Sequence, residues 1–176
     1  MNTTTAMNTK TLVIMALFTA LSFVGSNVKI FGSIAFDSLP GFVAALLLGP
    51  VQGAAIGFLG HLFTALTSGF PLSIPMHFVI AVSMAITMLG FGFTYNALKN
   101  RASERVSLAV TGIVGTILNG PVSLALSIST LAFLAGIEAA WGLLALLPVL
   151  TTAAIVNIVI AIALFKTLER VWNRGR

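Results

Sequence analysis

Two histidines and two asparagines lie inside long apolar stretches of this 176-residue chain. His61 falls within one stretch, and His77 lies near the start of the next. Asn119 opens an Asn-Gly-Pro sequence inside a third stretch, and Asn157 lies near the middle of the last. Ionisable and amide side chains are costly in hydrocarbon and usually face a cavity or a partner there. Their types and positions therefore predict a polar cavity between helices.

The Asn-Gly-Pro sequence adds a structural reason for such a cavity. A Gly-Pro pair within a helix frees backbone carbonyls and bends the helix, and broken helices often line binding cavities near the midplane of a membrane. Ser123 and Ser127 continue the polar face of Asn119 at i+4 and i+8. An alternative is that these side chains only join helices, at about 0.6 kcal/mol per bond. Their convergence favours a pocket for a small molecule.

Acidic and aromatic side chains gather in the segments between apolar stretches. Asp37 and Glu138 can accept charge-assisted hydrogen bonds from a ligand, or can be solvated loop charges. Phe70 and Trp141 can stack on a planar ligand, or can belong to the aromatic belt of a membrane protein. Each histidine likewise has a plainer role as a neutral side chain bonded to a neighbouring helix.

Several reaction classes lack their motifs. The chain has no cysteine and no carboxylate spacing that would complete a metal site with two lone histidines, so no metal and no cofactor are predicted. There is no phosphate loop, no Ser-His-acid signature and no run of basic and aromatic residues for nucleic acid. An intramembrane enzyme using His61 and His77 remains an alternative, as does a channel, although no charged ring is present.

Composition then fixes the environment of these residues. Hydrophobic residues make up 58% of the chain and charged residues 7%, with mean hydropathy +1.08, whereas soluble domains carry about 25% charged residues. A span needs about 20 apolar residues, and backbone groups in lipid must be satisfied internally. We expect an all-α integral membrane protein, a single domain over 1–176, with six transmembrane helices at about 11–25, 39–48, 51–66, 76–98, 106–131 and 146–168.

Orientation follows from the distribution of lysine and arginine. With six spans, all of the nine Lys and Arg residues except Lys29 fall on one side, including the 99–105 loop and Arg176. Basic residues mark the cytoplasmic side, so both termini are predicted to be cytoplasmic. The segments 26–38, 67–75 and 136–142 are then predicted to face outward, which places the candidate cavity toward the outside.

The first apolar stretch carries Ala16 and Ala20, four residues apart on one helix face. Small residues at this spacing let another helix approach closely. Together with GSIAFDSLPG at 32–41, LGPVQGA at 48–54 and GFLGH at 57–61, this pair resembles the substrate-binding S components of bacterial energy-coupling factor (ECF) transporters. The resemblance covers nearly the whole chain. It implies that the alanine pair docks on a shared transmembrane subunit.

The resemblance also implies a function and partners. An S component binds a vitamin or related metabolite from outside, without enzymatic activity, and works with a transmembrane coupling protein and two ATPases in the bacterial cell membrane. The stretches FDSLPG at 36–41 and GHLFTALTSGFP at 60–71 are similar to the subgroup for cobamide precursors, particularly α-ribazole, with pantothenate and cobalamin as alternatives. The predicted substrate-binding residues are Asp37, His61, Thr64, Phe70, His77, Asn119, Ser123, Glu138, Trp141 and Asn157.

Overall fold

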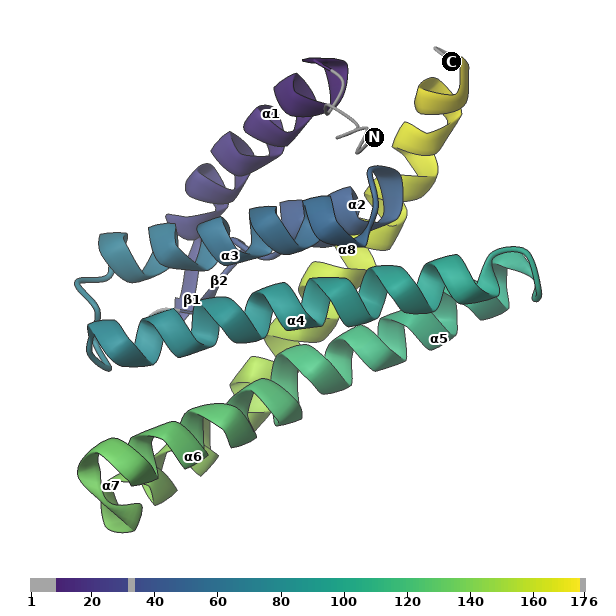
Figure 1. The fold of residues 1–176 in the computed structure, drawn as a ribbon. Helices are drawn as coiled ribbons and strands as arrows, with labels where there is room; N and C mark the ends of the chain where they lie inside the picture. Colours follow the sequence, from purple (N-terminus) through teal and green to yellow (C-terminus); the bar gives the residue numbers. More distant parts are fainter. Residues whose placement is uncertain (1–8, 32–33, 175–176) are drawn as a thin grey trace, which may run out of the picture.

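The computed structural model describes residues 9–31 and 34–174 (Figure 1). The two chain ends, with Arg176 of the predicted basic anchors, lie outside the described residues, and so do residues 32 and 33 of the quoted motif. The described chain is helical apart from one two-stranded antiparallel hairpin and short turns.

The elements follow the order of the predicted spans. The first half contains α1 (Thr9–Ser26), β1 (Lys29–Phe31), β2 (Ile34–Ala35), α2 (Leu39–Leu47), α3 (Pro50–Thr67) and α4 (Ile74–Leu98). The second half contains α5 (Glu104–Ile117), the π-helical turn η1 (Leu118–Val122), α6 (Ser123–Ala135), α7 (Ile137–Trp141), the 3-10 turn η2 (Gly142–Leu146) and α8 (Leu147–Arg174).

Four of the described segments are long and apolar enough to cross a membrane: Thr9–Ser26, Ile74–Leu98, Glu104–Ala135 and Ile137–Val171. Two predicted spans are not among them. The nine residues of α2 give about 14 Å at 1.5 Å per residue, which is half of a hydrocarbon core of about 30 Å. In the 18 residues of α3, Gln52 and His61 lower the hydropathy.

Two predicted loops contain regular structure. The segment 26–38 carries the β1–β2 hairpin, in which Lys29 pairs with Ala35 and Phe31 with Ile34. The segment 136–142 carries α7, which starts after Gly136 at φ 89°. The final helix also continues past the predicted end at 168, to Arg174.

The turns gather at two opposite ends of the molecule. The α2–α3 turn, the α4–α5 turn and the end of α8 lie on the right in Figure 1, whereas the α3–α4 turn and α7 lie on the left. The right-hand end includes the basic loop 99–105, and the left-hand end includes two of the segments predicted to face outward. The basic loop and two of the segments predicted to face outward therefore lie at opposite ends of the molecule.

The apolar core lies where α2, α4 and α8 meet. Phe42 of α2 packs edge-on against Phe91 of α4 at 4.8 Å between ring centroids, and Tyr95 packs against Phe165 of α8 at 5.5 Å. The α2 helix is almost wholly buried, since its residues from Pro40 to Leu46 are all buried. A buried short helix of this kind leaves the polar segment before it in the interior of the molecule.

Candidate functional site

A cavity lies between the β2–α2 segment, α4, the η1–α6 segment and α8. About 80 Å³ of it is open to the centre of a water molecule. One water needs about 10–15 Å³ by this measure, so the space holds roughly five to eight waters. Its polar lining residues are Asp37, Ser38, His61, Asn119, Ser123, Ser127 and Asn157, and its apolar ones are Ile34, Ala35, Leu72, Ile80, Met84, Leu124, Leu143, Leu146, Leu150, Ala153 and Ala154.

Asp37 is the buried acid of this cavity. Its residue is 3% exposed, and its Oδ2 accepts a hydrogen bond from the hydroxyl of Thr64 at 2.7 Å. The Nδ1 of His61 lies 3.6 Å from the same oxygen, which is an ion-pair distance too long for a good hydrogen bond. One helix face of α3 therefore holds the carboxylate from two positions three residues apart.

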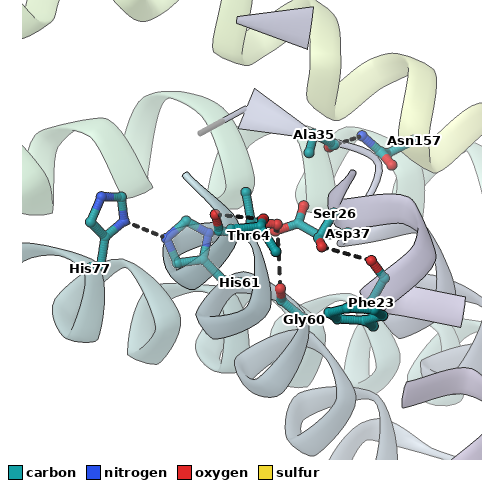
Figure 2. Close-up of polar contacts among 10 residues, drawn as sticks. Phe23, Ser26, Ala35, Asp37, Gly60, His61, Thr64, His77 and Asn157 are labelled. Atoms are coloured by element: carbon teal, nitrogen blue, oxygen red, sulfur yellow. Dashed lines mark hydrogen bonds and ion pairs between the residues drawn. The ribbon is translucent and has the colours of Figure 1, made fainter. Parts of the chain in front are cut away.

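A second histidine extends this arrangement. The Nε2 of His61 and the Nδ1 of His77 are 3.1 Å apart, so one donates to the other according to tautomer, and the rings are stacked at 5.4 Å. Figure 2 shows the resulting row, with Asp37 beside Thr64 and His61, and His77 beyond His61. Among the described residues, His77 Nε2 is buried without a partner. This row links three parts of the chain: α3, α4 and the segment that precedes α2.

Two glycines bring the Asp37 backbone this deep into the molecule. A Cβ on Gly25 of α1 would lie 2.5 Å from the Phe36 carbonyl oxygen, and one on Gly60 of α3 would lie 2.8 Å from that of Asp37. Real Cβ atoms do not approach that closely, so the chain passes between α1 and α3 only because both positions lack a side chain. Gly60, the glycine directly before His61 in GFLGH, thus allows Asp37 to lie close to that histidine.

Asn157 connects α8 to the hairpin. Its Nδ2 donates to the carbonyl of Ala153 at 2.9 Å and to that of Ala35 on β2 at 3.4 Å (Figure 2). The Oδ1 of the same amide is buried and has no partner among the described residues. The hairpin edge and the middle of α8 therefore meet at the cavity wall, with one acceptor left for another group.

The interruption predicted at the Asn-Gly-Pro sequence is a π-helical turn. Pro121 lies inside η1 and cannot donate a backbone hydrogen bond. Asn119 is 7% exposed, with a buried Oδ1 that has no described partner. Gly120 allows Thr151 of α8 to pack closely, since a Cβ there would lie 3.1 Å from its hydroxyl oxygen. The π turn is a common feature of functional sites and carries Asn119 to the cavity.

Comparison with known proteins identifies the family of this chain. A family model described as "ECF transporter, substrate-specific component" matches residues 10–169. The chain belongs to this family. A solved structure, described as "Structure and mechanism of the S component of a bacterial ECF transporter", aligns with a TM-score of 0.64 at 21% identity over 92% of this chain and 96% of that chain. At this identity the match shows a shared fold. A search of curated proteins finds no match.

The family is that of a membrane transporter's substrate-specific component and not an enzyme family. ECF S components are integral membrane proteins that work with an ECF transmembrane protein and ATPases. The S component described here is similar in having several long apolar helices. Its cavity is thus the candidate position for a substrate, since it collects the buried polar groups of four elements.

The predicted site residues divide into three groups in this S component. The cavity is lined by Asp37, His61, Asn119, Ser123 and Asn157. Thr64 and His77 do not line the cavity but bond to Asp37 and His61, and the Phe70 ring packs against His77 at 5.8 Å. Glu138 and Trp141 lie on the exposed surface of α7, away from the cavity lining.

Sequence reasoning missed most of the apolar wall. Leu143, Leu146, Leu150 and Ala154 recur at three- and four-residue steps and lead to Asn157. This spacing puts the four side chains on one face of the η2–α8 segment. The stripe was detectable in the sequence, but nearly every residue around it is equally apolar. Ser38 was also missed, because a serine before a helix normally suggests only a cap.

The alanines of the predicted docking pair lie on the outside. Ala16 and Ala20 are exposed on α1, and so are Val13, Leu17 and Val24, at 54%, 59% and 60%. The opposite face of α1 buries Ser22 and Ser26. The small-residue face is therefore turned away from the rest of the S component and is accessible to a neighbouring helix.

Proposed function

We propose that this S component captures a small vitamin or vitamin precursor from outside a bacterial cell and delivers it to an ECF transmembrane coupling protein driven by two ATPases. The observation that carries the proposal is the cavity itself. It combines a buried carboxylate, two asparagines and three serines with a larger number of aliphatic side chains. Ligand pockets are mostly apolar with a few convergent polar groups that fix orientation.

The proposal includes the membrane arrangement predicted from the sequence. Six helices, with both termini in the cytoplasm of a bacterial cell, place the α3–α4 turn and α7 on the outer side. The α2 helix then crosses only part of the bilayer, and the hairpin and the segment before α2 complete the passage within the protein. Non-helical backbone at membrane depth is tolerated where it is buried in protein or lines a cavity.

α-Ribazole is the compound that we place first for testing. It combines a flat benzimidazole with a ribose. The aliphatic side chains of Leu124, Leu146 and Leu150 offer an apolar surface for the ring system, and Asp37 and Asn157 offer acceptors for ribose hydroxyls. Pantothenate is an alternative that the cavity favours less, because its carboxylate would find no lysine or arginine among the lining residues. Cobalamin, by far the largest of the three compounds, is the last alternative.

Thermal unfolding of the purified protein in detergent tests this function. A ligand that binds only the folded state raises stability by RT ln(1 + [L]/Kd), so a genuine substrate shifts the unfolding temperature in proportion to log concentration. We expect one compound of a vitamin and cobamide-precursor panel to do so, and His61→Ala and Asn119→Ala to abolish the shift. The matched control is Asn27→Ala, which removes an exposed asparagine bonded to Phe23. A folded protein that no compound stabilises would contradict the proposal.

A further inference from the structure

Two polar side chains of the cavity present hydrogen-bond acceptors, rather than donors, to a ligand. Asn157 fixes the first part of this argument, because its Nδ2 already faces two carbonyl oxygens, those of Ala153 and Ala35. Rotating the amide would set its oxygen against both carbonyls, so the observed orientation is the favourable one. The buried Oδ1, which has no described partner, can therefore accept a hydrogen bond from a ligand.

Asp37 supplies the second acceptor. Its carboxylate lines the cavity, and its two described neighbours, the donor hydroxyl of Thr64 and the Nδ1 of His61, both approach the same oxygen, Oδ2. An ionised carboxylate has about four lone-pair sites on two oxygens, so this group has further accepting capacity. No lysine or arginine is among the residues that line the cavity.

Asn119 can offer either a donor or an acceptor. Its buried Oδ1 has no described partner, and since no described contact holds its NH₂, the amide can turn either group toward the cavity. Among the serines, the hydroxyl of Ser127 is already used, because it donates to the backbone oxygen of Ser123 at 2.9 Å. The two groups whose direction the contacts do fix, Asp37 and Asn157, both present acceptors to the cavity.

We infer that this site takes an uncharged or cationic ligand that presents at least two hydrogen-bond donors, one to Asp37 and one to Asn157, and that it rejects ligands whose recognised end is a carboxylate or a phosphate. The inference rests on the proposed function and names its substrate class. A buried acceptor left without a donor is costly. An anion placed beside Asp37 would lose its hydration and face a like charge with no neighbouring lysine or arginine to offset it.

Pairs of ligands that differ in one charged group test this inference on the wild-type protein. The probes are panthenol with pantothenate, nicotinamide with nicotinate, and α-ribazole with α-ribazole 5′-phosphate. Thermal shift identifies the pair that binds, and calorimetry gives both Kd values. We expect the uncharged member to bind at least about 100-fold more tightly, because placing a like charge beside a buried carboxylate is strongly unfavourable.

The outcomes separate the two proposals. An anionic member that binds as tightly as its uncharged partner overturns the inference and leaves the transport function standing. No binding by any compound to folded protein counts against the proposed function itself.

A charge-neutral variant gives a second measurement. Asp37→Asn keeps the shape of the side chain and removes the negative charge, so the preference for the uncharged ligand should narrow by about tenfold or more. Glu169→Gln is the control, because it makes the same change of charge in α8 outside the cavity lining, and it should leave the preference unchanged. If folded Asp37→Asn prefers the uncharged ligand as strongly as wild type does, the carboxylate is not what rejects anions. If this variant fails to fold, the wild-type ligand pairs still decide.

Discussion

Asp37 is a buried carboxylate whose position depends on one hydrogen bond and one longer polar contact, both from α3. Burial of an ionised group is expensive unless it is paired and bonded, and here a hydroxyl at 2.7 Å and a histidine at 3.6 Å share that task. Thr64 lies behind the cavity wall rather than in it. Its contribution is to hold the carboxylate in place, and this can be separated from ligand contact by mutation.

Thr64→Val should destabilise the protein by about 1.5–3 kcal/mol, the range for a hydrogen bond to a charged group. The substitution keeps the shape of the side chain and removes only the donor to Asp37. Thermal or denaturant unfolding in detergent measures the effect. The control is Thr94→Val in α4, whose hydroxyl bonds within its own helix to the Gly90 carbonyl and should cost about 0.5–1 kcal/mol. Equal losses in the two variants would show that the bond to Asp37 has no special weight.

Sequence reasoning located single residues better than their contacts. The costliness of His61 and Asn157 inside apolar segments was enough to predict that both face the interior. Spacing could not show that His61 and His77, sixteen residues apart, meet at 3.1 Å, because this depends on the angle between α3 and α4. Glu138 and Trp141 were predicted from their segment alone, and the short α7 helix places them on the surface.

At the scale of elements, close approach of α2 and α3 determines the depth of the site. A Cβ on Gly53 would lie 2.5 Å from the Ala45 Cβ and 2.7 Å from its Cα. The two helices therefore touch through backbone. Since α2 is the short buried helix that follows Asp37, its distance from α3 also sets the distance between Asp37 and His61.

Gly53→Ala should separate α2 from α3 and destabilise the protein by about 1–3 kcal/mol, the usual cost of overpacking. Gly112→Ala in α5 is the control. A Cβ there would make ordinary contacts of 3.5 and 3.6 Å with Ile158 and Ile162, and alanine gains about 1 kcal/mol of helix propensity over glycine. Unfolding temperatures of the two variants measure the difference. A Gly53→Ala protein as stable as wild type would mean that this contact can relax.

The elements show what local sequence rules could and could not supply. The Asn-Gly-Pro sequence predicted an interruption, and η1 is present there because Pro121 has no backbone N–H. The β1–β2 hairpin was not predicted. Its strands have three and two residues, too few for an alternating pattern, and Asn157 binds β2 from 122 positions away in sequence. Such a contact depends on the assembled helices.

At the scale of the whole molecule, the distribution of charge gives a topology that labelling can test. The chain lacks cysteine, so single cysteines can be introduced without a background. Glu138→Cys in α7 should react with a membrane-impermeant maleimide added outside intact cells, since the proposed topology puts α7 on the outer side. Ser103→Cys, exposed in the basic α4–α5 turn, should react only after lysis. Labelling of Ser103→Cys in intact cells would reverse the orientation.

The exposed face of α1 that carries Ala16 and Ala20 is the surface on which we expect the coupling protein to dock. Ala16→Trp puts a large side chain where a second helix must approach closely. We expect uptake by cells containing the complete transporter to be abolished, while the purified variant binds ligand as wild type does, because Ala16 is exposed and lies outside the cavity lining. Ala163→Trp on the exposed face of α8 is the matched control and should retain uptake. Normal uptake by Ala16→Trp would assign docking to another surface. Loss of ligand binding would instead mean that α1 supports the cavity, as its packing against Phe36 through Gly25 would allow.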